Sequence, residues 1–310
     1  MSTEPISVAI VTPVHNRRDI TVQCLRSLSR IKSDNLDVHV IVVDDGSTDG
    51  TSEAVSREFP DVEIIEAGGN LWFTEGTNVG VRQALESDPK YILMMNDDQV
   101  FDDKFLEYLV ETAEANPRSV VGPLLLLWDQ PHKIFQIAPV WNTWLGGWQH
   151  WYQQTIWSVP DRPFEVDLIV GNCVLVPTEA IRECGLMNSK RYPNFGDAEY
   201  TPRLKRAGWR LVIDPRSRVF CQPNTVPPRV RKKGIKALIN DLFIDLKNIH
   251  NLRRRWYSYI DGAPSKLKGA IAFVSFFVRA AIGRSPESAA FGENRAEPPL
   301  KETFRSAVIN

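Results

Sequence analysis

The chain is poor in cysteine and has no long hydrophobic run. Its 310 residues include only four cysteines, and no two of them form a CxxC pair. This argues against a zinc site or a disulfide framework and suits a reducing compartment. No uninterrupted apolar stretch approaches the roughly 20 residues that cross a bilayer. Residues 1–6 are mostly polar and do not open a signal peptide, so we expect a cytoplasmic protein that spans no membrane.

The charge is unevenly distributed, although the formal net charge is only −1. Residues 1–202 carry 15 Lys and Arg against 30 Asp and Glu, whereas residues 203–284 carry 19 against 4. The near-zero total is therefore the average of an acidic front and a basic tail. With 43% hydrophobic residues, the chain has enough apolar material for one large domain with an appendage.

Short apolar runs alternate with segments of helical periodicity in the first part of the chain. The runs suited to buried strands are 7–13, 37–43, 62–66 and 91–95. The helical segments that follow them are 17–30, 51–59, 78–85 and 104–115. This alternation predicts a doubly wound, mainly parallel α/β sheet. Later strands are expected at 120–128, 166–176 and 209–213, and later helices at 178–184, 204–208, 236–256 and 266–282.

Polar clusters follow three of the predicted strands, at Thr12–Asn16, Asp44–Ser47 and Asn96–Asp98. Ligands of such sheets bind beyond the carboxyl ends of the strands. The adjacent carboxylates of Asp97 and Asp98 repel each other and are costly to desolvate, and a divalent cation that arrives with a phosphate removes this cost. Asp44 and Asp45 need a donor, such as a nucleobase imide or a ribose hydroxyl. Both pairs also suit turns and helix caps, which is the alternative interpretation.

Four motifs occur in a fixed order between residues 7 and 215. They are Thr-Pro-Val-His-Asn from Thr12, Val-Val-Asp-Asp-Gly-Ser-Thr-Asp-Gly-Thr from Val42, the Asp pair at 97–98, and Gly-Asp-Ala-Glu-Tyr from Gly196. This order resembles family 2 glycosyltransferases, in which the last motif lies on the acceptor side. The segment Gly69-Asn70-Leu71, with Gly76-Thr77-Asn78-Val79-Gly80, resembles the donor loop of bacterial rhamnosyltransferase-like members.

The resemblance implies a GT-A-like catalytic domain over residues 1–222, with a nucleotide-sugar half at about 1–118 and an acceptor half at about 119–222. It implies an inverting enzyme that transfers a sugar from a nucleoside-diphosphate donor. We expect dTDP-rhamnose or a UDP-hexose as the donor and a hydroxyl of a glycan or lipid-linked molecule as the acceptor. The product would belong to a cell-envelope polysaccharide.

The resemblance also assigns roles to individual residues. Asp197 would be the general base, and Asp98 would bind a Mg²⁺ or Mn²⁺ ion. The residues that would hold the nucleotide sugar are Thr12, Pro13, Asn16, Asp45, Asn70, Trp72, Gly76, Asn78 and Asp97, with Phe73 beside Trp72. Glu199 and Trp148 would lie on the acceptor side, although Glu199 also suits a solvated position in the first turn of a helix.

Two positions depart from the family pattern. The metal motif reads Asn96-Asp97-Asp98 rather than Asp-x-Asp, so that Asn96 offers only a neutral oxygen. Cys221 stands where some relatives place a further His ligand, and a thiolate is a poor partner for Mg²⁺. The metal would then keep more waters or bind more weakly.

Aromatic and basic residues gather in the later part of the chain. Six of the nine tryptophans lie between residues 128 and 157, where they would form sugar-stacking walls, a hydrophobic core or a subunit interface. Residues 223–284 form a basic extension and 285–310 a polar, flexible tail. The apolar segment 269–278 suits a helix in a membrane interface, a pair of helices packed on the catalytic domain, or a homodimer contact. No base-reading motif accompanies the charge, so we expect no nucleic-acid partner.

Two other functions are compatible with such a sheet. One is a nucleotide-sugar-binding scaffold without turnover, against which Asp197 argues because binding alone needs no base. The other is a nucleotidyltransferase, which would need a glycine-rich phosphate loop near the first strand. Residues 12–18 contain no glycine.

Overall fold

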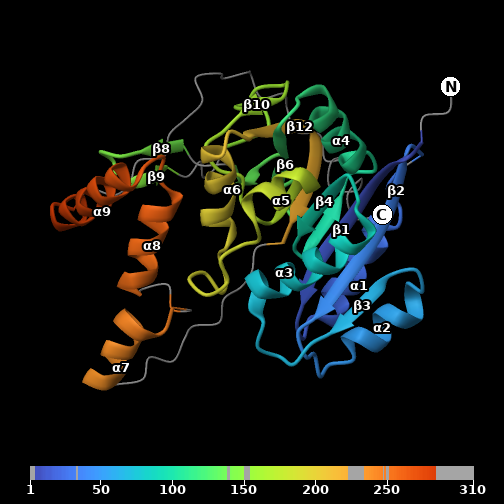
Figure 1. Cartoon of the computed structure of the whole chain (residues 1–310), viewed down its shortest axis with the longest axis horizontal. Helices are drawn as coiled ribbons and strands as arrows, with labels where there is room; N and C mark the ends of the chain where they lie inside the picture. The colour runs from blue at the N-terminus through green and yellow to red at the C-terminus, as the bar shows by residue number, and fades with distance from the viewer. Residues whose placement is uncertain are drawn as a thin grey trace.

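The computed structural model describes residues 4–32, 34–137, 140–149, 154–222, 234–246, 248 and 251–283. The expected flexible tail at 285–310, and the basic cluster at 231–233, lie outside the described residues. Within the described part, a curled sheet of ten strands forms the centre of the molecule, and three helices from the end of the chain lie beside it (Figure 1). The predicted α/β class is confirmed.

The first half of the sheet is parallel, as the alternating pattern predicted. It contains β1 (Ile6–Val14), β2 (Leu36–Asp44), β3 (Glu63–Glu66) and β4 (Tyr91–Met95). Their order across the sheet is β3-β2-β1-β4. In this register Val14 pairs with Asp44, and Asp44 with Glu66. The carboxyl ends of these strands, with the polar clusters that follow them, therefore meet at one edge.

The second half of the sheet continues from β4. Its strands are β6 (Ser119–Leu127), β10 (Phe164–Glu165), β11 (Cys173–Pro177) and β12 (Arg210–Cys221), with short strands β5 (Gln99–Phe101) and β7 (Ile134–Gln136). β11 runs antiparallel between β4 and β6, whereas β12 is parallel to β6. The sheet is thus mainly parallel with one central strand reversed. A separate hairpin joins β8 (Val140–Asn142) and β9 (Gly147–Gln149).

Most side chains of the strands pack alternately into two large cores, one on each face of the sheet, and a third, smaller cluster includes Leu124 and Leu126 of β6. In β1, Val8 and Ile10 belong to the first core, and Ala9 and Val11 belong to the second. The first is covered by α1 (Arg18–Leu28), α2 (Thr51–Glu58) and α4 (Phe105–Ala115). The second is covered by α3 (Trp72–Ala84), α5 (Thr178–Cys184) and α6 (Asp197–Arg206). Burial on both faces explains why these strands read as continuous apolar runs.

Helix α3 begins at Trp72 rather than at residue 78, so the expected donor loop is shorter. The carboxylate of Asp45 accepts hydrogen bonds from the backbone amides of Leu71 and Trp72. These amides have no partner within the helix, and a distant carboxylate supplies one. Gly76 lies inside α3, where a Cβ atom would be 2.8 Å from Cβ of Pro13. Its role in this structure is close packing rather than a turn.

Two predicted strand boundaries in the second half were also wrong. The strand expected over 166–176 is limited to β11, which starts at Cys173. The backbone of the preceding residues makes hydrogen bonds outside the sheet instead. The amide and carbonyl of Ile169, for example, exchange hydrogen bonds with the Thr201 side chain of α6. The last strand, β12, continues to Cys221 past a register shift between Asp214 and Arg218.

The end of the described chain contains α7 (Ile235–Ile239), a π-helical turn at Asn240–Ile244, α8 (Leu252–Gly262) and α9 (Lys266–Ala281). Helix α8 packs beside α6, so the terminal helices lie against the main body of the protein, one of the arrangements expected from the sequence (Figure 1). Asp261 of α8 pairs with Arg191 at 2.7 Å and accepts a hydrogen bond from the Tyr192 hydroxyl at 2.9 Å. None of the described helices has the length and apolar character needed to cross a membrane.

Candidate active site

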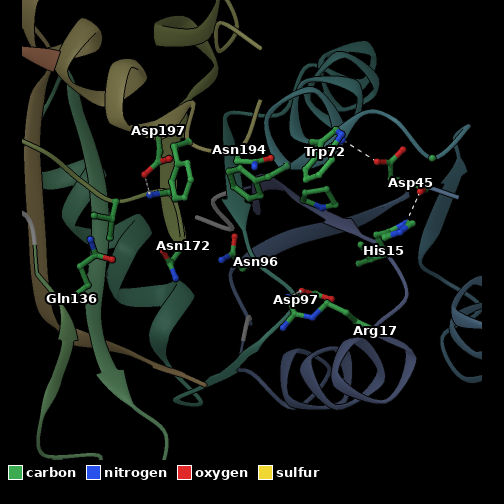
Figure 2. Close-up of a pocket in the computed structure, with 17 residues that line it drawn as sticks. His15, Arg17, Asp45, Trp72, Asn96, Asp97, Gln136, Asn172, Asn194 and Asp197 are labelled. Atoms are coloured by element: carbon green, nitrogen blue, oxygen red, sulfur yellow. Dashed lines mark hydrogen bonds and ion pairs between the residues drawn. The ribbon is translucent and has the colours of Figure 1, made fainter. Parts of the chain in front are cut away.

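A cavity of about 660 Å³ lies at the carboxyl ends of β1, β2 and β4 (Figure 2). Residues from both halves of the sheet line it. They are Pro13, Val14, His15, Arg17, Asp45, Gly69, Trp72, Phe73, Asn96, Asp97, Gln136, Val170, Gly171, Asn172, Asn194, Phe195 and Asp197. The cavity therefore brings together six of the residues that the sequence assigned to the site: Pro13, Asp45, Trp72, Phe73, Asp97 and Asp197.

The cluster after β2 divides into turn residues and one cavity residue. Asp44 accepts hydrogen bonds from the Ser47 amide and the Ser52 hydroxyl, as expected for a turn. Asp45 instead faces the cavity, and its backbone carbonyl accepts a 2.7 Å hydrogen bond from Nδ1 of His15. Its carboxylate oxygens accept the Leu71 and Trp72 amides at 3.0 and 2.9 Å. Each oxygen has more than one lone pair, so Asp45 retains capacity to accept from a ligand.

Arg17 bridges the two carboxylates that follow β4. Its Nη1 lies 3.0 Å from Oδ1 of Asp97, and its Nη2 lies 3.1 Å from Oδ2 of Asp98. Both aspartates are only 3% exposed, and the Thr21 hydroxyl also donates to Asp97 at 2.8 Å. Arg17 was not among the residues that the sequence assigned to the site. The signal was present, since two adjacent buried carboxylates require a positive partner and an Arg follows the first strand-end motif.

Burial raises the pKa of Asp97 to about 6, despite the opposing effects of Arg17 and Thr21. One guanidinium facing two carboxylates leaves a net negative charge when both are ionised. The remaining negative charge can therefore attract a further cation.

The oxygen atoms around this pair fit a hard cation. Oδ1 of Asp98 and Oδ1 of Asn96 are buried and have no hydrogen-bond partner among the described residues. Unpartnered carboxylate and amide oxygens are the ligands that Mg²⁺ and Mn²⁺ prefer. The described residues contain no group of three or more His, Cys, Asp or Glu side chains that could hold a metal ion. The oxygens of Asn96 and Asp98 could therefore supply only part of the ligands of such a cation, and phosphate and water would supply the others.

Cys221 does not resemble a metal ligand in this structure. Its thiol is buried, and burial raises its pKa well above the ordinary value. Nε2 of Gln99 lies 3.7 Å from its Sγ. A thiol that stays protonated is a weak ligand.

Asp197 is the first residue of α6 and lies across the cavity from Asp45, as Figure 2 shows. Its Oδ2 accepts a 2.9 Å hydrogen bond from the backbone amide of Gly171. A Cβ atom at position 171 would lie 2.5 Å from Cβ of Asp197, so only glycine permits this approach. Burial is the main cause that raises the pKa of Asp197, while the Gly171 hydrogen bond and the charge of Arg254 on α8 oppose it.

Five residues assigned to the nucleotide sugar do not line the cavity. Thr12 is fully buried within β1. Asn16 joins the two turns, because its backbone amide donates to the Ser47 hydroxyl and its Oδ1 accepts the Thr48 amide. Asn78 exchanges two hydrogen bonds with the backbone of Met187, at 2.9 and 3.1 Å. Asn70 is exposed outside the cavity, and Gly76 packs on Pro13 as described above.

The metal and acceptor-side assignments also include residues outside the cavity lining. Asp98 lies next to Arg17 but is not exposed to the cavity. Glu199 is buried and pairs with Arg203 one helical turn later. Trp148 on β9 packs edge-on against Trp141, with ring centroids 4.9 Å apart. Its indole nitrogen would lie 3.2 Å from a Cβ atom added at Gly262 of α8.

Apart from Arg17, the cavity residues that the sequence did not identify come mostly from irregular segments of the second half. They are Gln136, Val170, Gly171, Asn172, Asn194 and Phe195. No periodic pattern marks these positions. Only Asn194 and Phe195 could have been found from the sequence, because they directly precede the Gly196-Asp197 motif.

Comparison with known proteins gives consistent results. The family model described as Glycosyl transferase family 2 matches residues 9–147. An N-acetylglucosaminyl-diphospho-decaprenol L-rhamnosyltransferase of Mycobacterium tuberculosis (strain ATCC 25618 / H37Rv) is 25% identical over 276 residues. This alignment covers 80% of the present chain and 86% of the relative.

Solved structures support the GT-A fold. GalNAc-T7 with UDP, GalNAc and Mn²⁺ has a TM-score of 0.60 and 14% identity, over 92% of this chain and 56% of that one. TarS 1–349 of S. aureus in complex with UDP-GlcNAc has a TM-score of 0.56 and 12% identity, over 90% and 74% of the two chains. The motif order, the fold and the matched family model agree: the chain is a glycosyltransferase that resembles glycosyltransferase family 2 and bacterial rhamnosyltransferases.

Proposed function

We propose that the protein is an inverting glycosyltransferase that moves a sugar from a nucleoside-diphosphate donor to a hydroxyl of a lipid-linked glycan. The observation that carries this proposal is the single cavity in which Asp45 and Asp97 lie on one side and Asp197 on the other. The relative is an L-rhamnosyltransferase of N-acetylglucosaminyl-diphospho-decaprenol, and the transferred sugar favours dTDP-rhamnose as the donor. A UDP-hexose is the alternative.

The first half of the sheet would hold the donor. Asp45 and His15 lie where the nucleoside would bind, and Asp45 would accept a hydrogen bond from the base or ribose. Trp72 is 41% exposed, and its ring would pack against the donor sugar together with Phe73. Arg17, held at the carboxylate pair, would face the diphosphate.

Asp98, Asp97 and the oxygen of Asn96 would hold a divalent cation with the donor. When bound, this cation supplies positive charge that neutralises the leaving diphosphate. The neighbouring Arg17 guanidinium offers fixed donors for the same phosphate oxygens. The arrangement accounts for two buried carboxylates that the protein itself neutralises only in part.

Asp197 would be the general base on the acceptor side. Its carboxylate takes the proton from the acceptor hydroxyl while that oxygen forms a bond to the anomeric carbon. The bond from this carbon to the diphosphate breaks, and the electron pair leaves with the diphosphate. One displacement inverts the anomeric centre. The raised pKa of Asp197 suits a base that accepts a proton near neutral pH.

The test is Asp197→Asn, which preserves the shape of the side chain but cannot take the proton. We expect calorimetry with dTDP or UDP and Mn²⁺ to give wild-type affinity, and transfer to fall by about 10²–10⁴-fold, the contribution of a positioned base. Transfer near the wild-type rate would remove Asp197 from the chemistry. Donor binding by the wild type without transfer to any of a panel of acceptors would favour the scaffold function.

We further propose that α9 rests on the cytoplasmic face of a membrane. Its outer side carries an apolar stripe at helical spacing, with Leu267, Val274, Val278 and Ile282 exposed by 72%, 60%, 55% and 61%. Lys266 and Lys268 begin the same helix. Exposed apolar side chains beside basic ones suit an interfacial helix on anionic lipid. This position would bring a lipid-linked acceptor to the enzyme.

Vesicle sedimentation tests the membrane proposal. The wild type should pellet with phosphatidylglycerol vesicles at low salt and much less with phosphatidylcholine vesicles. The double variant Val274→Asp, Val278→Asp changes exposed positions only, and it should stay in solution while it still binds the donor. If the wild type stays in solution, and runs as a dimer that the double variant dissociates, the stripe is a subunit interface instead.

A further inference from the structure

Helix α8 places a cation beside the acceptor side of the cavity. The guanidinium carbon of Arg254 lies 4.2 Å from the ring centroid of Phe195. Phe195 lines the cavity and is 45% exposed. Arg254 and Asp197 attract each other electrostatically, and Arg254 is half-buried. A positive group that packs on the cavity residue Phe195 is therefore also within electrostatic range of the residue assigned as the base.

Several contacts fix the position of α8. Beyond the Asp261 contacts with Arg191 and Tyr192, the Arg206 side chain donates to the carbonyl of Ala263 at 2.9 Å. A Cβ atom at Gly262 would lie 3.0 Å from the carbonyl oxygen of Ala198, so the two helices approach closely. The Asn251 side chain caps α8 by accepting the amide of Arg254 at 2.9 Å. Arg254 is thus held by a rigid helix, as a binding residue should be.

The two neighbouring arginines have other surroundings. Arg253 is exposed, and it donates to the Phe243 carbonyl and the Tyr257 hydroxyl at 3.4 Å. The Arg255 guanidinium lies 4.5 Å from the ring centroid of Phe276 on α9. Of the three arginines, Arg254 is the one that packs on Phe195 and feels the charge of Asp197.

From this placement we infer that Arg254 and Phe195 form the binding site for the phosphate that carries the acceptor sugar. This inference rests on the proposed function. An acceptor hydroxyl at Asp197 would put the other end of its sugar ring toward Arg254, and guanidinium groups bind phosphate oxygens in a bidentate manner. Phe195 holds the guanidinium plane by stacking. The lipid would then continue along the exposed stripe of α9.

The test compares two acceptors: a short isoprenyl diphospho-N-acetylglucosamine, and an octyl glycoside of N-acetylglucosamine that has no phosphate. Arg254→Gln should raise KM for the phosphorylated acceptor by about 10–100-fold, with little change in kcat. KM for the glycoside should stay at the wild-type value. Arg254→Lys should recover part of the loss. The matched control, Arg253→Gln, removes the same charge from the same helix and should behave as the wild type with both acceptors.

Calorimetry measures the affinity for the phosphorylated acceptor directly and tests the same inference without sugar transfer. Equal affinity of the wild type and Arg254→Gln would overturn it. An equal loss with both acceptors would also overturn it, because Arg254 would then act only by positioning Asp197. So would a loss of dTDP or UDP binding, which would assign Arg254 to the donor diphosphate. Acceptor binding that depends on Arg254, in a wild type that transfers no sugar, would contradict the proposed function and leave the phosphate site established.

Discussion

Removal of Arg17 should destabilise the protein in a way that a divalent cation repairs. Arg17→Gln leaves the carboxylates of Asp97 and Asp98 facing each other, both 3% exposed and without the guanidinium that lies 3.0 and 3.1 Å away. The loss of one partner from a buried ion pair costs about 3–5 kcal/mol. Because the Arg17 side chain is 30% exposed, we expect the lower end of that range, about 3 kcal/mol. This corresponds to a Tm lower by about 6–12 °C for a domain of this size.

Mn²⁺ without nucleotide should then stabilise the variant more than the wild type. In the wild type a cation must share the carboxylates with Arg17, whereas in the variant it takes over an unneutralised pair. Thermal unfolding followed by fluorescence across an Mn²⁺ titration at pH 7.5 measures this difference directly. The readout is independent of catalysis.

The pH dependence gives a second check on the same variant. The pKa of Asp97 is about 6 in the folded protein, above the value of about 3.9 for an unfolded Asp. The folded state therefore binds more protons between these values, and the contribution of Asp97 to stability increases as the pH falls. Without Arg17 this pKa should rise further, so the deficit of the variant should shrink toward pH 5.5. Arg18→Gln, which alters an exposed neighbour, is the control. A variant as stable as the wild type at pH 7.5, or equal stabilisation of both by Mn²⁺, would refute the reasoning.

Two further predictions concern the acceptor side. Burial raises the pKa of Asp197, and the base must be ionised, so activity should fall on the acid side at a pH above the ordinary range of an Asp pKa. A profile of kcat/KM against pH measures this, and an acid limb at the ordinary pKa of an Asp would contradict the prediction. Gly171→Ala places a Cβ atom 2.5 Å from that of Asp197, so transfer should fall by about 10-fold or more, in line with the cost of misplacing a catalytic group, while dTDP binding is kept. The control Gly68→Ala, where no atom lies within 4 Å of the added carbon, should leave transfer near the wild-type rate.

The strands of the first half could be predicted because their signal is local. Tyr91–Met95 is apolar throughout and forms β4 with those bounds, since a strand buried on both faces needs no alternation. The start of α3 could not be predicted in this way. Its first amides are capped by Asp45, which precedes Trp72 by 27 residues, and no local pattern announces that contact. Long-range capping of this kind overrides the turn-like composition around Gly69 and Gly76.

Site residues could likewise be predicted where a local pattern marks them, and could not where their role depends on a long-range contact. Strand-end carboxylates such as Asp45 and Asp97 could be placed together because parallel strands share an edge. The contribution of Arg17 depends on the loop after β1 turning back toward β4, and the sequence shows the charge without its direction. Gly171 could not be identified, because its role exists only when the loop before β11 meets the first turn of α6.

The uneven charge of the chain acquires a structural meaning through α8. The acidic front contains the carboxylates to which we assign binding and reaction, whereas the basic tail, read alone, was compatible with a lipid surface, a pair of packed helices or a homodimer contact. The Asp261 and Arg191 side chains, 70 positions apart, dock α8 against the part of the chain that precedes α6, and Arg254 of the same helix packs on the cavity residue Phe195. The basic extension is thus continuous with the acceptor side of the cavity. Under the proposals above, Arg254 on α8 binds the acceptor phosphate, and the apolar stripe of the adjoining α9 rests on the lipid surface. The docking of α8 then fixes the positions of Arg254 and of the stripe relative to the base, Asp197.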